Sequence, residues 1–329
     1  MATVTTNDKQ VQSDVRQWVL AAEDRIREHI LETAMEYSPH LSKVIDGEVY
    51  LKLDLMQKTG SFKFRGATSK IMSLTEEELS RGVLAASTGN YALAVAAAAK
   101  IRGSRATIYV AEDIVPARLE LIKSHGVDVV VYGKEAWDAE KKARQVAEEE
   151  NKIYVSPYND PIVVGGQDTC GLEISRQLPD LDAAFFAVGA GGLCGGSAGW
   201  LKSFNPDIEV FGVSPENSPI MYESVKAGKI IEMDFSPTLA DTCAGGVDLD
   251  SPTLELLQKY TDEIILLTEQ EIEDSIRLLF EQHRLVAEGS AALSVGALLK
   301  RKNSFRGKKV VLTICGRNIG LDLFKQIIA

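Results

Sequence analysis

Short apolar runs rich in β-branched residues alternate with helix-like patterns along most of this 329-residue chain. Each run is bounded by glycine, proline or polar residues, which is typical of a buried strand between turns. The alternation at this spacing predicts an α/β fold with open, mostly parallel sheets flanked by helices. The predicted strands are Val49–Leu53, Val83–Ala86, Thr107–Val110, Val127–Tyr132, Ile153–Val155, Ala183–Val188, Ile208–Val213, Ile264–Leu267 and Val310–Ile314.

Helices are predicted where apolar residues recur at three- and four-residue steps, and where a hydroxyl and a carboxylate can cap a helix start reciprocally. The periodic stretches run from Val15 to Ile30, from Glu135 to Glu150 and from Glu269 to Gln282, and the capping boxes are Thr75-x-x-Glu78 and Thr268-x-x-Glu271.

The composition excludes several classes of protein. With 45% hydrophobic and 25% charged residues, the chain has enough apolar material for a large core and is not a mostly disordered protein. Its length suits two domains, and because no repeat or Pro/Ser-rich linker separates them, they are expected to be interleaved. A net charge of −11 would repel phosphate backbones and anionic lipid, so neither nucleic acid nor a membrane is expected as a partner.

Four scattered cysteines, Cys170, Cys194, Cys243 and Cys315, have no C-x-x-C spacing. Sparse cysteine of this kind fits a reducing compartment, and no metal site is predicted from the dispersed cysteines and histidines. The N-terminus is polar and has no apolar segment typical of a secretory signal, so a cytoplasmic location is expected.

A glycine-rich turn, Gly189-Ala190-Gly191-Gly192-Leu193, follows the strand Ala183–Val188. Backbone amides of such a turn, together with a helix N-terminus, can hold an anion. A Walker A loop would need a following Gly-Lys-Ser/Thr, and a dinucleotide fingerprint would need glycine at the sixth position, where Cys194 stands. A phosphate-binding turn therefore fits best, and the alternative is a tight turn that binds nothing.

The segment Gly195-Gly196-Ser197-Ala198-Gly199 matches the G-x-S-x-G pattern of hydrolases. In that pattern the serine lies on the sharp turn directly after a strand, whereas Ser197 falls inside the predicted helix. We therefore expect Ser197 to bond within the protein or to pack against it.

Lys63 lies between Phe62 and Phe64 at the start of a helical stretch. Helix N-termini disfavour cations, so this amine could deprotonate easily and act as a nucleophile. The alternative is a surface lysine that extends past two phenylalanines.

Two further turns follow predicted strands. Ser87-Thr88-Gly89-Asn90-Tyr91 offers hydroxyls, an amide and free helix amides, which suit a carboxylate, although an ordinary helix N-cap uses the same residue types. Cys315-Gly316-Arg317-Asn318 follows the last strand, at the strand end where open α/β sheets place ligands.

Taken together, these motifs resemble those of fold-type II pyridoxal-phosphate enzymes, and most closely the threonine/serine dehydratase and serine racemase group. Ser61–Ala67 resembles the group's cofactor-lysine motif, Ser87–Asn90 its substrate-carboxylate loop, Gly189–Leu193 its phosphate loop and Cys315–Asn318 its segment under the pyridine nitrogen. Weaker similarities are Gly166–Thr169, Gly212–Glu216, Ala240-Asp241 and Glu288–Ala291.

The resemblance implies a domain organisation and residue roles. A large domain, residues 1–81 and 160–329, would bind pyridoxal 5′-phosphate, and a small inserted domain, residues 82–159, would close over an amino-acid substrate; a homodimer is expected. Lys63 would hold the cofactor and act as the base on Cα, with Phe62 near the ring, Asn90 on the ring oxygen and Cys315 facing the ring nitrogen. The phosphate would lie on Gly189, Ala190, Gly191, Gly192 and Leu193, and the substrate on Ser87, Thr88, Gly89, Asn90 and Tyr91.

The implied reaction is β-elimination from a 3-hydroxy amino acid such as threonine, serine or 3-hydroxyaspartate, giving a 2-keto acid and ammonia. A thiol at Cys315 cannot hold a charge on the ring nitrogen as a carboxylate would, which favours rapid loss of a β-leaving group. Serine racemase has a serine where Thr88 stands. Because Thr88 also carries a hydroxyl, amino-acid racemisation is one alternative function. The second alternative is a protein that binds pyridoxal phosphate without catalytic activity.

Two charges depart from the family pattern. Arg317 could pair with a substrate side-chain carboxylate, and Asp168, where the family has glycine, could favour an amino-bearing substrate. The alternative for both is a solvated charge at the rim of the cleft. The family's divalent-metal site has a glutamate where Ser214 stands, so that metal is not predicted.

Overall fold

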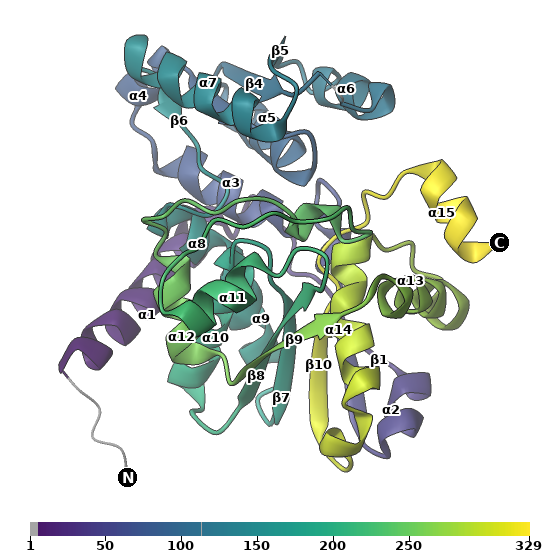
Figure 1. Cartoon of the computed structure of the whole chain (residues 1–329). Helices are drawn as coiled ribbons and strands as arrows, with labels where there is room; N and C mark the ends of the chain where they lie inside the picture. Colours follow the sequence, from purple (N-terminus) through teal and green to yellow (C-terminus); the bar gives the residue numbers. More distant parts are fainter. Residues whose placement is uncertain (1–5, 113) are drawn as a thin grey trace.

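The computed structural model describes residues 6–112 and 114–329, which form a six-stranded and a four-stranded sheet with helices packed around them (Figure 1). The six-stranded sheet has the order β1 (Met35–Tyr37), β2 (Glu48–Lys52), β10 (Lys309–Thr313), β7 (Ala183–Ala187), β8 (Glu209–Pro215) and β9 (Glu263–Leu267). The four-stranded sheet has the order β5 (Asp128–Val131), β4 (Ala106–Val110), β3 (Val83–Ala86) and β6 (Ile153–Tyr154).

All nine predicted strands form, and the predicted fold class is confirmed. Every neighbouring pair is parallel except β1 and β2. The sequence prediction missed β1, which is only three residues long and mostly exposed, so it has no buried face to create a pattern. Its Tyr37 ring packs edge-on against Tyr50 of β2.

The predicted helices are also present. Both capping boxes form: the hydroxyls of Thr75 and Thr268 accept hydrogen bonds from the backbone amides of Glu78 and Glu271. The first helix differs from the prediction, because it begins at Thr6 within the polar leader and ends at Ile26. The leader's residues 1–5 lie outside the described residues.

The α-helices are α1 (Thr6–Ile26), α2 (Pro39–Ile45), α3 (Lys63–Ser73), α4 (Glu76–Arg81), α5 (Asn90–Arg102), α6 (Pro116–Lys123), α7 (Ala136–Glu149), α8 (Pro161–Gln167), α9 (Thr169–Gln177), α10 (Gly192–Phe204), α11 (Ile220–Ala227), α12 (Thr253–Tyr260), α13 (Glu269–His283), α14 (Gly289–Lys300) and α15 (Leu321–Ile328). Short 3-10 turns lie at Asp54–Met56, Asp241–Cys243 and Lys302–Phe305. None of the helices in the described chain is long and apolar enough to cross a membrane.

The four-stranded sheet is covered on both faces. Alternate residues of β3 belong to different apolar clusters, as the two-residue period of a strand requires. Val83 and Ala85 pack in a cluster with helices α3 and α5, whereas Leu84 and Ala86 pack with the alanines of α7. This burial of both faces explains why the strand reads as a continuous apolar run.

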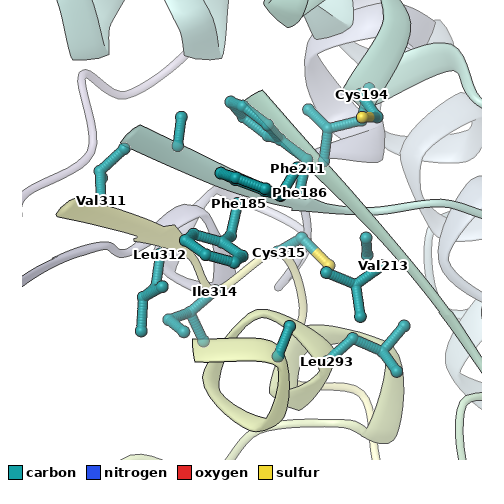
Figure 2. Close-up of a cluster of buried hydrophobic side chains, with 14 of the residues drawn as sticks. Phe185, Phe186, Cys194, Phe211, Val213, Leu293, Val311, Leu312, Ile314 and Cys315 are labelled. Carbon is teal, nitrogen blue, oxygen red and sulfur yellow. The ribbon is translucent and has the colours of Figure 1, made fainter. Parts of the chain in front are cut away.

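The six-stranded sheet carries the larger core (Figure 2). Phe185 stacks on Phe211 at a centroid distance of 4.9 Å, and Phe305 packs edge-on against both rings. Helix α14 packs against β7 to β10, while α10 packs against β7 and is backed by α1, α9 and α12. Burial of one such phenylalanine stabilises the fold by about 1.5–3 kcal/mol.

The smaller sheet interrupts the larger one in the sequence. Strands β3 to β6 come between β2 and β7, and Figure 1 shows them with α5, α6 and α7 as a separate upper layer. This interleaving agrees with the absence of a linker in the sequence. The domain boundaries at 81/82 and 159/160 stay a prediction.

Candidate active site

A cavity lies where the carboxyl ends of β7 and β10 meet the starts of α3, α5 and α10. Open α/β sheets place ligands at this end of their strands. All four motifs identified in the sequence contribute residues to its wall, and the motif Ser87–Tyr91 contributes only Asn90. The lining residues are Phe62, Lys63, Asn90, Tyr158, Ala187, Gly189, Ala190, Gly191, Gly192, Leu193, Thr242, Cys243, Ser290 and Cys315.

Lys63 is the first residue of α3, as predicted, and its amine lies in the cavity wall. Its Nζ donates a long hydrogen bond of 3.5 Å to the carbonyl of Pro157 and lies 4.9 Å from the centre of the Phe62 ring. Removal from bulk water lowers the pKa of Lys63 to about 8, although nearby Cys243, Cys315 and Glu288 oppose the shift. The amine is therefore far easier to deprotonate than that of a surface lysine.

The turn Gly189–Leu193 joins β7 to α10 and forms one side of the cavity. Gly191 has φ +88°, and a Cβ on it would lie 2.7 Å from Leu257. A Cβ on Gly189 would lie 3.0 Å from the Cα of Cys243. Glycine at these positions lets the backbone turn and pack closely, and the first residues of α10, Gly192 and Leu193, line the cavity. The free amides of a helix N-terminus suit an anion.

Asn90 begins α5 and is almost fully buried in the cavity wall. Its Nδ2 donates to Glu288 Oε1 at 2.8 Å, and its Oδ1 accepts from Asn318 Nδ2 at 2.5 Å. The Asn90 side-chain amide therefore lines the cavity with both its nitrogen and its oxygen hydrogen-bonded to other side chains.

The residues around Asn90 lie less directly on the cavity. Ser87, Thr88 and Gly89 form the preceding turn, in which Ser87 Oγ accepts from the amide of Gly89. Tyr91 is buried, donates to the carbonyl of Ser156 at 2.6 Å and places its ring 5.9 Å from Lys63 Nζ. Within the described residues these four are not part of the cavity wall, so their contact with substrate stays a prediction.

Cys315 follows β10 and lies between the cavity and the apolar core, among the residues shown in Figure 2. Its carbonyl accepts from the amide of Phe62, and Ser61 pairs with Gly316, so this segment is joined to the start of α3. Burial raises the pKa of Cys315 well above its usual value. A neutral thiol therefore lines the cavity, and its place under a ring nitrogen stays a prediction.

Arg317 and Asp168 differ in their placement. Arg317 is exposed, with its guanidinium beside Met56 rather than in the cavity wall. The alternative for Asp168, a solvated charge at the cleft rim, is wrong, because Asp168 lies fully buried between α8 and α9, against Gly196 and Ser197 of α10. It is not among the residues that line the cavity in the described chain. Its Oδ1 accepts a 3.5 Å hydrogen bond from Ser197, and burial raises its pKa well above the usual value.

Ser197 is thereby accounted for as a buried helix residue that bonds within the protein. The sequence prediction of a structural role for this serine agrees with its bond to Asp168.

Several cavity residues had no assigned role. Thr242 and Ser290 belong to segments with a weak family similarity, and their hydroxyls are 2.6 Å apart. Cys243 and Tyr158 gave no signal, since neither lies in a patterned segment. In the part of the chain that the structure describes, no group of three or more His, Cys, Asp or Glu side chains is arranged to hold a metal ion.

Comparison with known proteins identifies the family. The model of the pyridoxal-phosphate dependent enzyme family matches residues 26–316. The chain is 42% identical over 310 residues to an L-threonine ammonia-lyase of Thermotoga maritima, covering 93% of this chain and 76% of that protein. It is 36% identical over 314 residues to a catabolic L-threonine dehydratase of Escherichia coli K12, covering 94% of each.

Solved structures agree. The chain resembles a serine racemase from Dictyostelium discoideum, with a TM-score of 0.85 and 34% identity, covering 97% of this chain and all of that one. A threonine deaminase from Solanum lycopersicum has a TM-score of 0.91 and 28% identity, with 96% and 92% covered. The predicted family and cofactor are confirmed, and the relatives' names agree with the predicted ammonia-lyase chemistry. The chain belongs to the pyridoxal-phosphate-dependent enzyme family.

Proposed function

We propose that this chain is an ammonia-lyase that removes the β-hydroxyl from a 3-hydroxy amino acid such as threonine, serine or 3-hydroxyaspartate. One observation carries the proposal: a single cavity brings together the easily deprotonated amine of Lys63, the glycine cradle Gly189–Leu193 and the neutral thiol of Cys315.

The cavity fits pyridoxal phosphate. Lys63 offers an amine for the aldehyde, and the amides of Gly189–Leu193 offer donors for the phosphate. Asn90 would bond the ring oxygen, Phe62 would lie beside the ring, and Cys315 would face the ring nitrogen. When bound, the cofactor withdraws electrons from Cα, which makes the Cα proton acidic and allows a β-substituent to leave.

Lys63 supplies the base for the Cα proton. With a pKa of about 8, about a tenth of the free amine is neutral at pH 7, compared with about one part in three thousand for a lysine at the ordinary value of 10.5. The cavity thus holds a usable base at neutral pH.

The products follow from the atoms that move. The Cα–H and the β-C–O bonds break, water leaves, and the resulting enamine takes up water to give a 2-keto acid and ammonia. Because a neutral thiol at Cys315 does not stabilise a proton on the ring nitrogen, it favours prompt loss of the hydroxyl over persistence of negative charge at Cα.

Racemisation is the second candidate, on the strength of the Thr88 hydroxyl. Thr88 lies half-buried in the turn before Asn90, where the family's racemase has a serine that returns a proton to Cα. Chiral analysis of serine after incubation separates the two activities, because a racemase must accumulate D-serine.

A panel of 3-hydroxy amino acids tests the main proposal. We expect the purified chain to carry bound pyridoxal phosphate and to form a 2-keto acid and ammonia in equal amounts from at least one of them. Lys63→Ala should abolish turnover. Full turnover by Lys63→Ala, or a chain with no affinity for the cofactor, would overturn the proposal.

We also propose a cytoplasmic location and a homodimer. All four cysteines are free, which suits a reducing compartment. Light scattering after size-exclusion chromatography would measure the assembly, and a monomer at working concentration would contradict the homodimer.

A further inference from the structure

Glu288 is a buried carboxyl directly behind the cavity wall. It directly precedes α14, is 3% exposed, and its backbone amide donates to the carbonyl of Gly316. A Cβ on Gly316 would overlap the Glu288 carboxylate, so a glycine leaves the space that this side chain occupies. A carboxylate so enclosed requires partners, because an unpaired buried charge is costly.

Two partners of this carboxylate, the Asn90 amide and the Asn318 backbone amide, can only donate to it. Oε1 accepts from Asn90 Nδ2 at 2.8 Å. Thr242 Oγ1 lies 3.4 Å from the same oxygen, but its single hydrogen is also within reach of Ser290 Oγ at 2.6 Å. Oε2 accepts from the backbone amide of Asn318 at 3.1 Å. Both oxygens face donors, an arrangement that suits an ionised carboxylate and that an amide cannot match. Burial raises the pKa of Glu288 to about 7 against the opposing hydrogen bonds from Asn90 and Asn318, so the ionised form predominates above that pH.

Asn318 fixes the opposite end of Asn90. Its Nδ2 donates to the carbonyl of Thr59 at 3.0 Å and to Asn90 Oδ1 at 2.5 Å. Both acceptors are carbonyl oxygens, so both Nδ2 hydrogens of Asn318 are used and its amide has one orientation. It follows that Asn90 turns Oδ1 toward Asn318 and Nδ2 toward Glu288.

One hydrogen of Asn90 is left over. Its Nδ2 carries two hydrogens, of which Glu288 takes one, and Asn90 lies in the cavity wall with Lys63 and Cys315. The cavity is therefore offered a donor. If the amide were free to turn over, it could present Oδ1 instead and repel an oxygen anion.

We propose that Glu288 is a positioning residue that, together with Asn318, holds the Asn90 amide so that one N–H faces an ionised ring oxygen of the bound cofactor. This inference rests on the proposed function. The clamp stabilises the ionised form of that oxygen, and a ring with an ionised oxygen absorbs at longer wavelength than one with a neutral oxygen. The ratio of the two absorption bands of the bound cofactor thus reports the clamp independently of turnover.

The test compares Glu288→Gln, Glu288→Asp and Asn318→Ala in the holoenzyme. In Glu288→Gln, one carboxylate oxygen becomes an NH₂ group that faces either Asn90 Nδ2 or the amide of Asn318, so two donors oppose each other. Losing a hydrogen bond to a charged group corresponds to a shift of about tenfold in the band ratio toward the neutral form. Glu288→Asp keeps the charge and should lie between wild type and Glu288→Gln.

Asn318→Ala tests the clamp from its other side. It leaves Glu288 intact and should shift the band ratio in the same direction, so the inference remains testable if Glu288→Gln does not fold. Glu271→Gln is the matched control, because the Glu271 carboxylate also accepts from a backbone amide, that of Thr268, but lies in α13, away from the cavity. Its band ratio should equal that of wild type.

The outcomes separate the two proposals. If the wild-type chain takes up no cofactor through Lys63, the proposed function fails. If wild type binds the cofactor but folded Glu288→Gln and Asn318→Ala keep the wild-type band ratio, the function stands and the role of Glu288 is wrong.

Discussion

The guanidinium of Arg65 binds the carboxylate of Glu173 through two hydrogen bonds of 2.7 and 2.8 Å in the fully buried interior. Arg65 also binds Asp54, and Glu173 also binds Lys52, so two buried cations face two buried anions. Arg65 lies on α3, two residues after Lys63. The cluster therefore anchors the helix that carries the cofactor lysine to β2 and α9.

We expect Glu173→Gln to lower the free energy of unfolding by about 3–5 kcal/mol, because it leaves buried cations without full compensation. Chemical denaturation measures this loss. The control is Glu273→Gln, which removes one partner of a half-buried surface pair with Arg277 and should cost about 0–1 kcal/mol. Similar losses in the two variants would show that the buried cluster is not an anchor.

The reactivity of Lys63 should depend on pH with a midpoint near 8. Because the pKa of Lys63 is lowered to about 8, the neutral amine that attacks an aldehyde increases as the pH rises to about 8 and then levels off. The measurement is the rate of pyridoxal-phosphate uptake by cofactor-free protein, followed by absorbance between pH 6 and 10. Lys63→Ala is the blank, and a midpoint near 10.5 would mean that the amine is not desolvated.

Gly191 and Gly228 form a matched pair for testing the phosphate cradle. Both have positive φ, but a Cβ at Gly191 would meet Leu257, whereas a Cβ at Gly228 would meet nothing within 4 Å. Each change to alanine should cost about 1–3 kcal/mol of stability through backbone strain. Only Gly191→Ala should also weaken pyridoxal-phosphate binding, by about tenfold or more if one phosphate hydrogen bond is lost. The dissociation constants are measured by titrating cofactor-free protein with pyridoxal phosphate. Equal constants for the two variants would mean that the turn around Gly191 does not bind the phosphate.

Much of this arrangement could be predicted from the sequence, for a local physical reason. Strands β3 and β7 are continuous apolar runs, and β10 has an apolar centre between Lys309 and Thr313. The turns after them place Asn90, Gly189–Leu193 and Cys315 at the same end of parallel sheets. Lys63 was found from its neighbours and its position at a helix start. Local pattern made these residues candidates, but it left a surface lysine, an empty turn and an ordinary helix N-cap as alternatives. The resemblance of the four motifs together to one enzyme family decided between them.

The rest depends on contacts between distant segments. Cys243 lies in a segment with almost no regular structure, and that segment is tied to the smaller sheet's helices by two ion pairs, Arg118–Asp241 and Arg144–Asp248. No periodicity marks such a segment. Asp168 was misplaced for a related reason: a charged residue is ordinarily exposed, and only the packing of Gly196 against its carboxyl shows that it is buried.

The buried carboxyl of Asp168 should make stability fall with rising pH. Its pKa is raised well above 3.8 in the folded protein, so between about pH 4 and that raised value the unfolded chain is ionised while the folded chain keeps its proton. The folded state then binds more protons, and the free energy of unfolding decreases as the pH rises, by up to about 1.4 kcal/mol per pH unit for one group. Asp168→Asn cannot titrate, so its stability relative to wild type should increase across this window.

Chemical denaturation of wild type and Asp168→Asn at several pH values between 4 and 8 measures that difference. Comparing slopes cancels any constant cost of the buried amide, which has the same shape as the acid but different hydrogen bonding. Glu173 does not confound the comparison, because both proteins retain it. The substrate preference of Asp168→Asn should stay that of wild type, since Asp168 does not line the cavity in the described structure. Parallel pH profiles of stability would mean that Asp168 is ionised in the folded protein. A changed substrate preference would mean that Asp168 acts on the substrate after all.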